Sequence, residues 1–383
     1  MNYVGLMSGT SLDGIDAVLV DLEGTAADLR WHVRAFRSDP WSVEERARIA
    51  AATETGTPAS LCRLHVDLGE AFARATLALL DEAGVDPSDV AAIGSHGQTV
   101  WHEPPTAERR GATLQLGDPA TLAERTGIPV VSDLRARDVA AGGHGAPLVC
   151  FADRLLLAAD GGRAVQNLGG MGNVTWIPPR RDARHDLLAF DTGPGNALID
   201  AAVELASAGR ATYDRDGRRA ARGHVDASLL DELMSHPFFA TEPPRSTGRE
   251  VFGRPYVQAL AERLQPTDVQ AWDDLVATLT ALTARSVGDA LRRWVLPRGV
   301  DDLVLVGGGA HNPTLVAAIA SALAPLPVVP ARAVGMDPDA REAIGFAVLA
   351  WAFQNVVAGN EVGATGAAGP RLLGSWTPGR ALR

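Results

Sequence analysis

The chain has 383 residues, 46% of them hydrophobic, and a formal net charge of −11. This length is enough for two domains of ordinary size, and the negative charge argues against a nucleic acid or an anionic membrane surface as a partner. All 35 basic residues are arginine. Mechanisms that need a lysine, such as a Walker A phosphate loop or a Schiff base, are therefore excluded.

Cysteine content and apolar runs narrow the class of protein further. Cys62 and Cys150 are far apart and outside any CxxC pattern, so we expect neither a disulfide framework nor a thiolate zinc site. The longest apolar run, around residues 344–353, is well short of the roughly 20 residues that span a bilayer. The N-terminus lacks the charged and apolar regions of a secretory signal. We therefore expect a soluble, cytoplasmic protein without a membrane partner.

The stretch 4–20, VGLMSGTSLDGIDAVLV, contains two apolar runs joined by a polar, glycine-containing turn. This pattern predicts a β-hairpin. The turn residues are of the types that hold phosphate, because glycines admit close backbone N–H groups and hydroxyls donate to phosphate oxygens. Asp13 or Asp16 could bind a metal ion. An ordinary polar turn is the alternative, since Gly, Ser and Asp are common in turns.

Apolar periodicity and turn residues predict the elements that follow in the first half. They are helices over 42–52 and 59–83, strands over 90–93 and 129–131, a glycine-rich loop over 142–147 and a helix over 148–158.

The second half begins with a similar hairpin, in which apolar runs flank the glycine-rich turn 167–173. Further on, the pattern predicts a strand over 188–190, a turn over 191–196, a helix over 197–206 and a strand over 302–306 that enters Gly307-Gly308-Gly309, with Pro313 opening a helix. Each half thus combines a glycine-loop hairpin with strand–turn–helix units, which indicates a duplicated architecture with a boundary near 155–163. The Gly- and Ala-rich residues 359–383 are expected at the surface.

The glycine loops and longer strings of this chain resemble a known superfamily. Hairpins in both halves and the late strand–GGG–helix unit are similar to acetate kinases, sugar kinases, Hsp70 and actin. More specifically, MSGTSLDGID, SHGQT, NLGGMGN, FDTGPGN, PPRSTGREVF and GGGAHN, starting at residues 7, 95, 167, 190, 243 and 307, together resemble the anhydro-N-acetylmuramic acid kinase family over about 3–355.

The resemblance implies an α/β fold of two related ribonuclease H-like domains around an ATP cleft. We expect an N-terminal domain, 1–158, with the first phosphate loop and part of the sugar site. A C-terminal domain, 159–383, would carry the catalytic aspartate, the second phosphate loop and the nucleoside loop, its last segment packing back on the first domain. The resemblance also implies a homodimer and the cofactors ATP and Mg²⁺.

Three positions depart from the family's usual residues. Leu134 stands where Phe is usual, His144 where Gln is common and Arg245 where Lys is usual. Arginine keeps the charge of lysine but changes the geometry of its donors. None of these substitutions is expected to touch the residues of the chemistry, although His144 falls in the expected substrate loop.

The implied reaction is phosphorylation of the sugar's O6 by ATP, coupled to hydrolytic opening of its 1,6-anhydro ring. Asp191 is the candidate general base, because it follows a strand and precedes a glycine turn that would project its side chain into a cleft. The alternative is an N-cap for the helix at Ala197, but Asn196 lies nearer to the cap position.

The phosphates are expected on two glycine loops and the nucleoside on the GGG turn. The candidate nucleotide-binding residues are Gly9, Thr10, Ser11, Leu12, Asp13, Gly14, Ile15, Asp16, Asn167, Gly169, Gly170, Gly307, Gly308, Gly309 and Asn312, with Asp13 and Asp16 as candidate Mg²⁺ ligands. A GGG turn after a strand also suits a dinucleotide-binding fold, but no GxGxxG with a downstream acid accompanies it.

The candidate sugar-binding residues are His96, Gln98, Arg135, Gly145, Asp191 and Glu342. Arg135 suits the lactyl carboxylate, because a guanidinium binds a carboxylate bidentately. Glu342 is a candidate catalytic residue at the start of a mostly apolar helix, where it could equally serve only the helix dipole.

Two other functions stay open. A different sugar or carboxylate kinase would share the nucleotide site without the water-activating role of Asp191. An ATP-driven binding protein of the Hsp70 or actin kind would need an additional partner-binding region, for which the chain offers no extra length.

Overall fold

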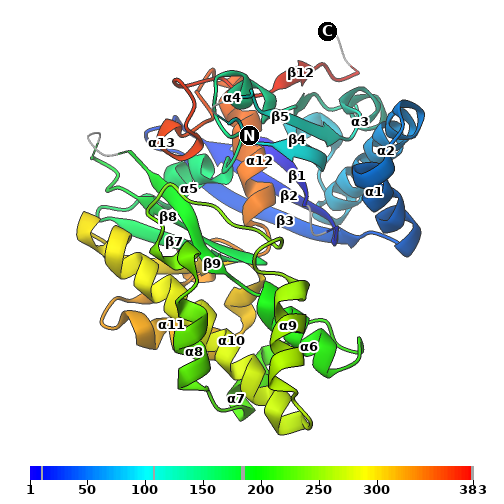
Figure 1. Cartoon of the computed structure of the whole chain (residues 1–383). Helices are drawn as coiled ribbons and strands as arrows, with labels where there is room; N and C mark the ends of the chain where they lie inside the picture. Colours follow the sequence, from blue (N-terminus) through cyan, green and yellow to red (C-terminus); the bar gives the residue numbers. More distant parts are fainter. Residues whose placement is uncertain (10–11, 107, 183–185, 381–383) are drawn as a thin grey trace. The chain divides into compact units, whose positions relative to one another are not determined.

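The computed structural model describes residues 1–9, 12–106, 108–182 and 186–380. The chain divides into two compact units, which are described here one at a time (Figure 1). Unit 1 consists of Met1–Leu156 and Ala340–Arg383, and unit 2 of Leu157–Asp339. The last 44 residues, from Ala340, thus belong to unit 1 although unit 2 precedes them in the chain.

Unit 1 contains one mixed sheet and the helices around it. Its strands are β1 (Asn2–Ser8), β2 (Gly14–Glu23), β3 (Arg30–Pro40), β4 (Val90–Glu103), β5 (Ala112–Leu116), β6 (Val130–Ser132) and β12 (Ser375–Thr377). Its helices are α1 (Val43–Thr55), α2 (Pro58–Ala83), the 3₁₀ turn η1 (Pro87–Asp89), α3 (Pro119–Thr126), α4 (Ala136–Ala140), α5 (Val149–Leu157, ending at the unit boundary), α12 (Arg341–Gln354) and α13 (Val362–Thr365).

The sheet of unit 1 has the order β12-β6-β4-β1-β2-β3, with β5 paired to β4. The predicted first hairpin is confirmed, because β1 and β2 pair antiparallel. Beyond it, β2 pairs antiparallel with β3, whereas β4 lies parallel to β1 and β6 parallel to β4. The first three strands therefore form a meander, and the next two return by crossovers.

The core of unit 1 lies between the sheet and α2. This helix begins with a Thr57 capping box and Pro58 and ends at Gly84, whose left-handed conformation (φ 61°) suits glycine. Its apolar face, with Leu68 and Phe72, belongs to one buried cluster with Val4 and Leu6 of β1. Side chains alternate along a strand, so Gly5 faces the opposite side of the sheet.

On that opposite side, α12 lies directly on the sheet (Figure 1). A Cβ at Gly5 would overlap the backbone carbonyl of Ala343, and one at Gly94 that of Phe346. Glycine is thus required in β1 and β4 by the close approach of helix backbone to strand backbone. The approach fixes the start of α12, which carries Glu342.

Unit 2 contains a second mixed sheet and a larger set of helices. Its strands are β7 (Arg163–Leu168), β8 (Met171–Ile177), β9 (Leu188–Pro194), β10 (Asp302–Val306) and β11 (Val328–Pro330). Its α-helices are α6 (Ala197–Ala206), α7 (Arg218–Arg222), α8 (Ala227–Met234), α9 (Arg254–Leu264), α10 (Val269–Ala290) and α11 (Pro313–Leu323). Shorter helical turns are η2 (Arg215–Gly217), η3 (Pro237–Ala240), the π-helical η4 (Leu291–Val295), η5 (Leu296–Arg298), η6 (Gly308–His311) and η7 (Ala331–Val334).

The sheet of unit 2 repeats the topology of unit 1. Its order is β11-β10-β7-β8-β9, with β7, β8 and β9 an antiparallel meander and β10 and β11 added in parallel. In both sheets the first three strands of the unit lie in the order third, second, first, followed by two parallel strands, β4 and β6 in unit 1 and β10 and β11 in unit 2. The predicted duplication and the α/β class with two related ribonuclease H-like domains are confirmed.

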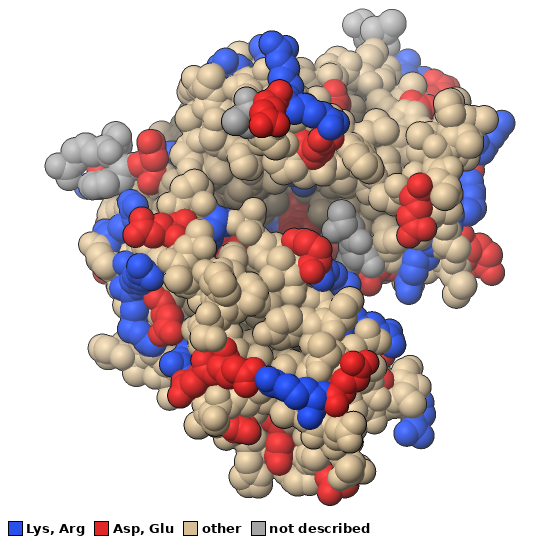
Figure 2. Space-filling model, viewed as in Figure 1, with Lys and Arg blue, Asp and Glu red and all other residues tan. Residues whose placement is uncertain are grey.

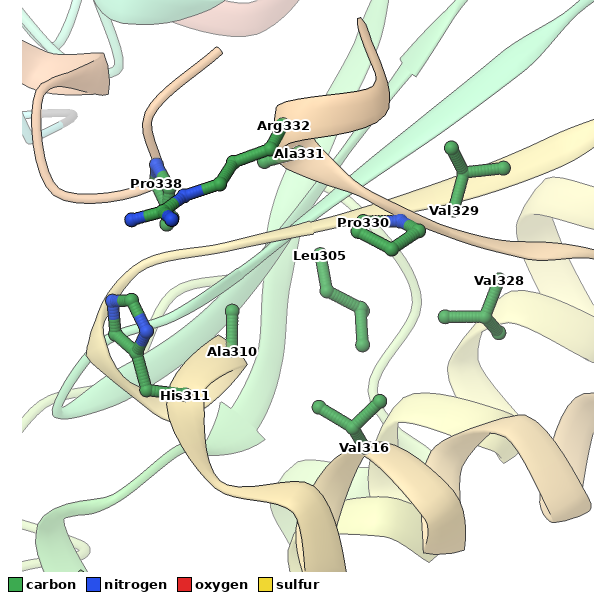
Figure 3. Close-up of a pocket in the computed structure, with 10 residues that line it drawn as sticks. All are labelled: Leu305, Ala310, His311, Val316, Val328, Val329, Pro330, Ala331, Arg332 and Pro338. Atoms are coloured by element: carbon green, nitrogen blue, oxygen red, sulfur yellow. The ribbon is translucent and has the colours of Figure 1, made fainter. Parts of the chain in front are cut away.

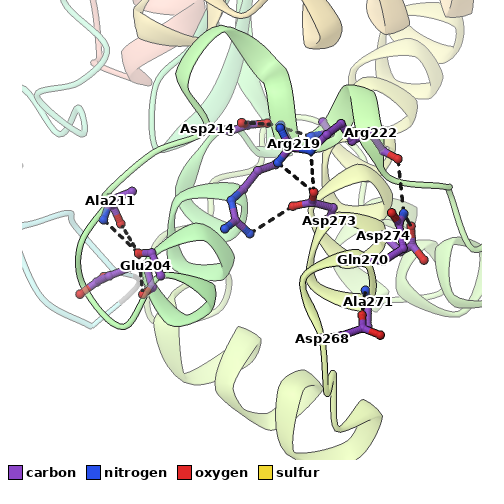
Figure 4. Close-up of polar contacts among 12 residues, drawn as sticks. Glu204, Ala211, Asp214, Arg219, Arg222, Asp268, Gln270, Ala271, Asp273 and Asp274 are labelled. Carbon is purple, nitrogen blue, oxygen red and sulfur yellow. Dashed lines mark hydrogen bonds and ion pairs between the residues drawn. The ribbon is translucent and has the colours of Figure 1, made fainter.

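A buried carboxylate ties the short helix α7 to the long helix α10 (Figure 4). Asp273 of α10 is 1% exposed and pairs with Arg219 and Arg222 of α7, at 3.2 and 2.9 Å. Asp214 accepts the backbone N–H groups of Arg219 and Ala220. The contacts continue to the start of α11, where the Thr314 hydroxyl donates to the Gly217 carbonyl over 2.9 Å. This cluster holds the helical layer against the element that follows the GGG turn.

Charged residues are mixed over the surface of each unit, where Figure 2 shows arginine and acidic side chains interspersed. Within the described residues, no helix combines the length and the apolar character that crossing a membrane requires.

The C-terminal segment differs from its expected surface position. Asn360 and Thr365 are 6% and 1% exposed, and Leu373 is 1% exposed. The small residues of this segment predicted a surface position. In the structure they allow its backbone to pack closely against unit 1, and a few larger side chains are buried there. Two of these buried residues, Asn360 and Thr365, donate hydrogen bonds to Asp138, which also binds the expected sugar loop at Gly145.

We predict that Gly94→Ala destabilises unit 1, because the new methyl group meets the Phe346 carbonyl, which is fixed within α12. We expect a loss of about 3 kcal/mol in the free energy of unfolding, measured by urea denaturation. Gly369→Ala is the matched control, since a Cβ there meets only the flexible Arg371 side chain. Equal stability of the two variants would contradict the close approach of α12.

Candidate active site

The first glycine loop of unit 1 is anchored at its base by Ser8, the last residue of β1. The Ser8 hydroxyl lies 2.9 Å from the Gly14 carbonyl and 2.7 Å from Oε1 of Gln98, and the Trp41 indole donates to it over 3.2 Å. The Gln98 amide donates to the Gly9 carbonyl over 3.2 Å. These contacts hold the two ends of the loop in place.

The predicted residues of this loop have different positions. Gly9 and Asp16 are half-buried, Asp13 is exposed, and Ile15 is part of the unit 1 core. Leu12 has a left-handed backbone (φ 58°), which is unusual for a residue other than glycine. A Cβ at Gly14 would overlap the Asp39 carbonyl of β3. Thr10 and Ser11 lie outside the described residues.

Strand β4 extends to Glu103, so the predicted strand end at residue 93 is wrong, and His96 and Gln98 lie within the strand. Gln98 is fully buried and its amide is used by the first loop. We therefore propose that Gln98 positions this loop rather than contacting the sugar directly.

His96 and Arg135 form a joined pair in unit 1. Nε of Arg135 donates to Nε2 of His96 over 2.9 Å, and the other ring nitrogen lies 2.7 Å from the Gly97 carbonyl. This pattern assigns the proton to Nδ1 of a neutral imidazole. Burial, together with the nearby Arg135 charge, lowers the pKa of His96 to about 3. His96 is therefore neutral at physiological pH. It orients the guanidinium and adds no second positive charge beside it.

Arg135 in turn connects to the glycine-rich loop 142–147. Its Nη1 donates to the Gly145 carbonyl over 2.6 Å. Burial lowers the pKa of Arg135 to about 10, while the Glu342 and Asp138 carboxylates raise it, so the side chain is cationic at neutral pH. Because the Glu342 carboxylate raises this pKa through its charge, the expected acid of α12 lies within electrostatic range of Arg135. Arg135 is thus bonded to His96 and Gly145, and the charge of Glu342 acts on it.

Asp138 fixes this loop from below and was not predicted. It is fully buried, and its Oδ2 accepts the Gly145 N–H over 2.8 Å. Its Oδ1 accepts from Asn360 and Thr365 of the C-terminal segment, at 2.8 and 2.7 Å. No local pattern indicates these contacts, because the partners lie more than 200 residues apart in the chain.

In unit 2, the second glycine loop is locked onto the start of α6. The carbonyls of Gly169 and Gly170 accept the backbone N–H groups of Asn196 and Gly195 at 2.8 and 2.9 Å. The Asn196 side chain does not cap α6 but donates to the Leu168 carbonyl over 2.8 Å. The peptide groups of the loop are therefore held in one orientation by the helix that follows Asp191.

The GGG turn packs against the same loop. Val306 of β10 lies beside Asn167 of β7 in the parallel ladder. A Cβ at Gly307 would meet the Asn167 side chain, and one at Gly309 would lie 2.7 Å from Cβ of Leu168. A Cβ at Gly308 would meet nothing within 4 Å. The turn thus has one side on the loop and one open side, a cradle that fits a nucleotide phosphate or ribose approaching the backbone.

A cavity of about 190 Å³ lies next to this turn (Figure 3). Figure 3 shows His311 and Arg332 on one side of it and the apolar side chains of Leu305, Val316 and Val328 on the other. Asn312, a predicted nucleotide-binding residue, is instead the N-cap of α11, and its side-chain oxygen accepts the Leu315 N–H over 3.0 Å.

Asp191 lies within β9, which continues to Pro194, so the predicted strand end before this residue is wrong. The ladder with β8 is irregular at this point, because Gly172 pairs with Gly193 and Asn173 with Asp191. Thr192 is the additional residue, as in a β-bulge, a feature that redirects side chains next to functional sites. Asp191 is therefore aimed by a bulge rather than by the end of a strand.

The Asp191 carboxylate is half-buried, and burial raises its pKa to about 6, although the Thr247 N–H and the Arg245 charge lower it. Oδ2 accepts the Thr247 N–H over 2.8 Å. Among the described residues, this is the hydrogen bond that the carboxylate receives, and Oδ1 remains for a ligand or water. A carboxylate with a pKa near neutrality can accept a proton efficiently.

Arg245 holds the backbone around Asp191, so the expectation that this substitution touches none of the chemistry is wrong. Its Nε donates to the Asp191 carbonyl over 2.9 Å, and the Asp191 N–H donates back to the Arg245 carbonyl over 3.1 Å. The guanidinium lies over the rings of Phe238 and Trp294, 4.7 and 4.5 Å from their centroids.

Thr247 carries a second feature that the sequence did not reveal. Its hydroxyl is buried and has no hydrogen-bond partner among the described residues. Such a group next to a candidate base is suited to a bound water.

The described residues contain no group of three or more His, Cys, Asp or Glu side chains arranged to hold a metal ion.

We predict that Asp191→Asn stabilises the protein. The pKa of Asp191 in the folded state, about 6, exceeds its usual value of 3.8. As the pH rises from about 4 to about 6, ionisation of this buried carboxylate therefore lowers the free energy of unfolding of the wild type. The variant should match the wild type near pH 4 and exceed it by about 2 kcal/mol above pH 6.5, measured by urea denaturation at several pH values.

The control for this measurement is Asp231→Asn, since Asp231 is exposed and pairs only at the surface with Arg285. We expect its stability to stay within about 0.5 kcal/mol of the wild type at every pH. An Asp191→Asn variant that is never more stable than the wild type would contradict the raised pKa.

Comparison with known proteins identifies the family. The sequence pattern of the anhydro-N-acetylmuramic acid kinases matches residues 1–379. The kinases of this name from Caldanaerobacter subterraneus subsp. tengcongensis and Streptomyces coelicolor are each 44% identical to the chain, over 97% and 99% of its length and 95% and 94% of theirs.

Solved structures give more distant likenesses. The ADPNP-bound activator of 2-hydroxyisocaproyl-CoA dehydratase from Clostridium difficile is 14% identical with a TM-score of 0.42, covering 92% of this chain and 94% of its own. The ROK family glucokinase from Streptomyces griseus, in complex with glucose and AMPPNP, is 12% identical with a TM-score of 0.39, covering 91% and 99%. From the sequence matches over its whole length, the chain belongs to the anhydro-N-acetylmuramic acid kinase family.

Proposed function

We propose that the protein is an ATP-dependent kinase that opens the 1,6-anhydro ring of 1,6-anhydro-N-acetylmuramic acid and phosphorylates O6. The products are N-acetylmuramic acid 6-phosphate and ADP. Membership of the family supports the kinase activity, since relatives with the name of this enzyme match the chain over nearly their whole lengths. The contacts of Asp191 and of the glycine turns support the assignment of roles.

The observation that carries the proposal is the environment of Asp191. Opening the ring requires a base that takes a proton from water, and burial gives Asp191 a pKa of about 6. The Thr247 N–H binds one carboxylate oxygen, and the Thr247 hydroxyl, which has no hydrogen-bond partner among the described residues, offers a second group for the attacking water. A kinase that only transfers a phosphoryl group to a free hydroxyl has no need for a water-binding group beside its base.

The proposed reaction consists of four bond changes, two at the sugar carbon C1 and two at the γ-phosphorus of ATP. Water attacks C1 of the sugar and gives a proton to Asp191, while the C1–O6 bond breaks. O6 forms a bond to the γ-phosphorus of ATP, and the bond between that phosphorus and the β,γ-bridging oxygen breaks to release ADP. O6 becomes a nucleophile only as the ring opens, which couples the two events.

Sugar recognition is assigned to the cluster of unit 1. The Arg135 guanidinium is oriented by His96 and Gly145, and its remaining N–H groups suit the lactyl carboxylate of the sugar. Glu342 would bind a sugar hydroxyl from the first turn of α12. Discrimination follows because a site with a buried cation disfavours a sugar that lacks the carboxylate.

Nucleotide binding is assigned to the two glycine loops and the GGG turn. Residues 9–16 and Asn167–Gly170 would hold the phosphates through backbone N–H groups. The turn Gly307–Gly309 and the adjacent cavity would take the nucleoside, with the apolar side chains against the base and Arg332 or His311 at its edge.

Magnesium fits the first loop by the chemistry of its donors. Mg²⁺ is usually held by one or two carboxylates together with water and substrate phosphates, and Asp13 and Asp16 flank the loop with one exposed and one half-buried carboxylate. The ion would neutralise charge that develops between the β- and γ-phosphates.

We further propose a cytoplasmic homodimer that recycles peptidoglycan fragments.

The test is ADP release with ATP, Mg²⁺ and 1,6-anhydro-N-acetylmuramic acid, compared with N-acetylglucosamine and with no sugar. We expect release only with the anhydro sugar, and a product mass increased by one water and one phosphoryl group (HPO₃). The rate should fall below about pH 6, where Asp191 becomes protonated. Asp191→Asn should reduce kcat by at least about 10²–10⁴-fold, whereas the control Asp231→Asn should retain it.

Each other result has a definite meaning. Phosphorylation of N-acetylglucosamine would indicate another sugar kinase and remove the ring-opening role of Asp191. ADP release without any sugar would favour an ATP-driven binding protein. Near-normal activity of Asp191→Asn would contradict its role as the base.

A further inference from the structure

Arg249 lies against the second glycine loop of unit 2. An ideal Cβ at Gly170 would be 3.3 Å from Nη2 and 3.5 Å from Nε of this arginine. The guanidinium therefore covers the face of Gly170 from which a side chain would project. Arg249 is itself exposed, so the group faces solvent on its other side. A ligand held by this loop would meet the arginine.

The loops themselves bring no positive charge to a phosphate. Residues 8–16 and 167–173 contain no arginine, lysine or histidine. Transfer of a phosphoryl group spreads negative charge over its three equatorial oxygens, and enzymes of this type compensate it with cations. Because the chain has no lysine, any side-chain cation for this purpose must be an arginine or a histidine.

Arg249 also has no acidic partner among the residues that the structure describes. The ion pairs formed by the described residues include many of the exposed arginines, such as Arg254 with Glu204 at 2.7 Å, but not Arg249. An exposed arginine without a carboxylate keeps its donors for an incoming anion. Its planar fork matches two phosphate oxygens at once.

The backbone that carries Arg249 is fixed on both sides. On one side, Arg245 and Thr247 are bonded to Asp191. On the other, the Phe252 N–H donates to the Gly248 carbonyl over 2.9 Å, and Phe252 is fully buried. One short segment, 245–252, therefore connects the candidate base to the second glycine loop. Such preorganisation is what charge stabilisation in a transition state requires.

We propose that Arg249 is a catalytic residue that binds the transferring γ-phosphoryl group and stabilises its charge during transfer. This inference rests on the proposed function, because it assumes that the second glycine loop holds the phosphates of ATP. The segment 245–252 then serves both halves of the reaction, with Thr247 at the water-activating carboxylate and Arg249 at the phosphate.

The experiment compares Arg249→Gln with the matched control Arg254→Gln, an exposed arginine five positions further along that pairs with Glu204. We expect Arg249→Gln to lower kcat about 10²–10³-fold with the KM for the sugar within about threefold of the wild type. Arg249→Lys should recover part of the rate, because it restores the charge without the fork. The control should keep wild-type kinetics.

A binding measurement separates this proposal from the proposed function. Titration calorimetry without sugar gives the affinities for a non-hydrolysable ATP analogue and for ADP. We expect Arg249→Gln to lose affinity for the analogue while keeping that for ADP. This result supports Arg249 at the γ-phosphate even if the sugar assay fails in the wild type. Unchanged kcat and analogue affinity, or an equal loss of affinity for ADP, would overturn the proposal.

Discussion

Direct contact of backbone with backbone at glycine positions is the constraint on which the rest of the structure depends. In unit 1, Gly5 and Gly94 let α12 lie on the sheet, and the first turn of this helix carries Glu342, whose charge acts on Arg135. In unit 2, a Cβ at Gly195 would overlap the Gly169 carbonyl, so the loop and the start of α6 also meet through their backbones. Sites built in this way are rigid and leave little room for substitution.

The candidate base Asp191 lowers the stability of the folded protein while its raised pKa suits it to accept a proton. Burial raises the pKa of Asp191, which is unfavourable for folding at neutral pH, and the Thr247 N–H and Arg245 limit this cost. Arg245 reaches four backbone carbonyls, those of Asp191, Phe238, Phe239 and Thr241, more than the three donors of a lysine could serve. The family's usual lysine would therefore support this loop with fewer bonds. Function and stability oppose each other here, as is common at active sites.

Patterns that are local in the sequence predicted much of the fold. The two hairpins, the strand Asp302–Val306 and the helix Ala197–Ala206 agree with the structure because apolar runs, caps and glycine turns determine them over a few residues. Strand β3 was not predicted, although Trp31, Val33 and Ala35 alternate with polar residues along it, which is the pattern of a half-buried strand. The surroundings of Asp191 could not be predicted either, since Arg245 is 54 residues away in the chain and the pKa depends on burial. The same holds for Asp138, whose partners come from the C-terminal segment.

The central claim is that Asp191 activates a water molecule that opens the ring as O6 is phosphorylated. Its most direct test is a reaction in H₂¹⁸O, quenched before the hemiacetal exchanges with solvent, followed by mass spectrometry of the sugar phosphate. The account predicts one ¹⁸O atom in each product molecule, bound to C1, and none in the phosphate. A product without the label, or with the label in the phosphate, would contradict it.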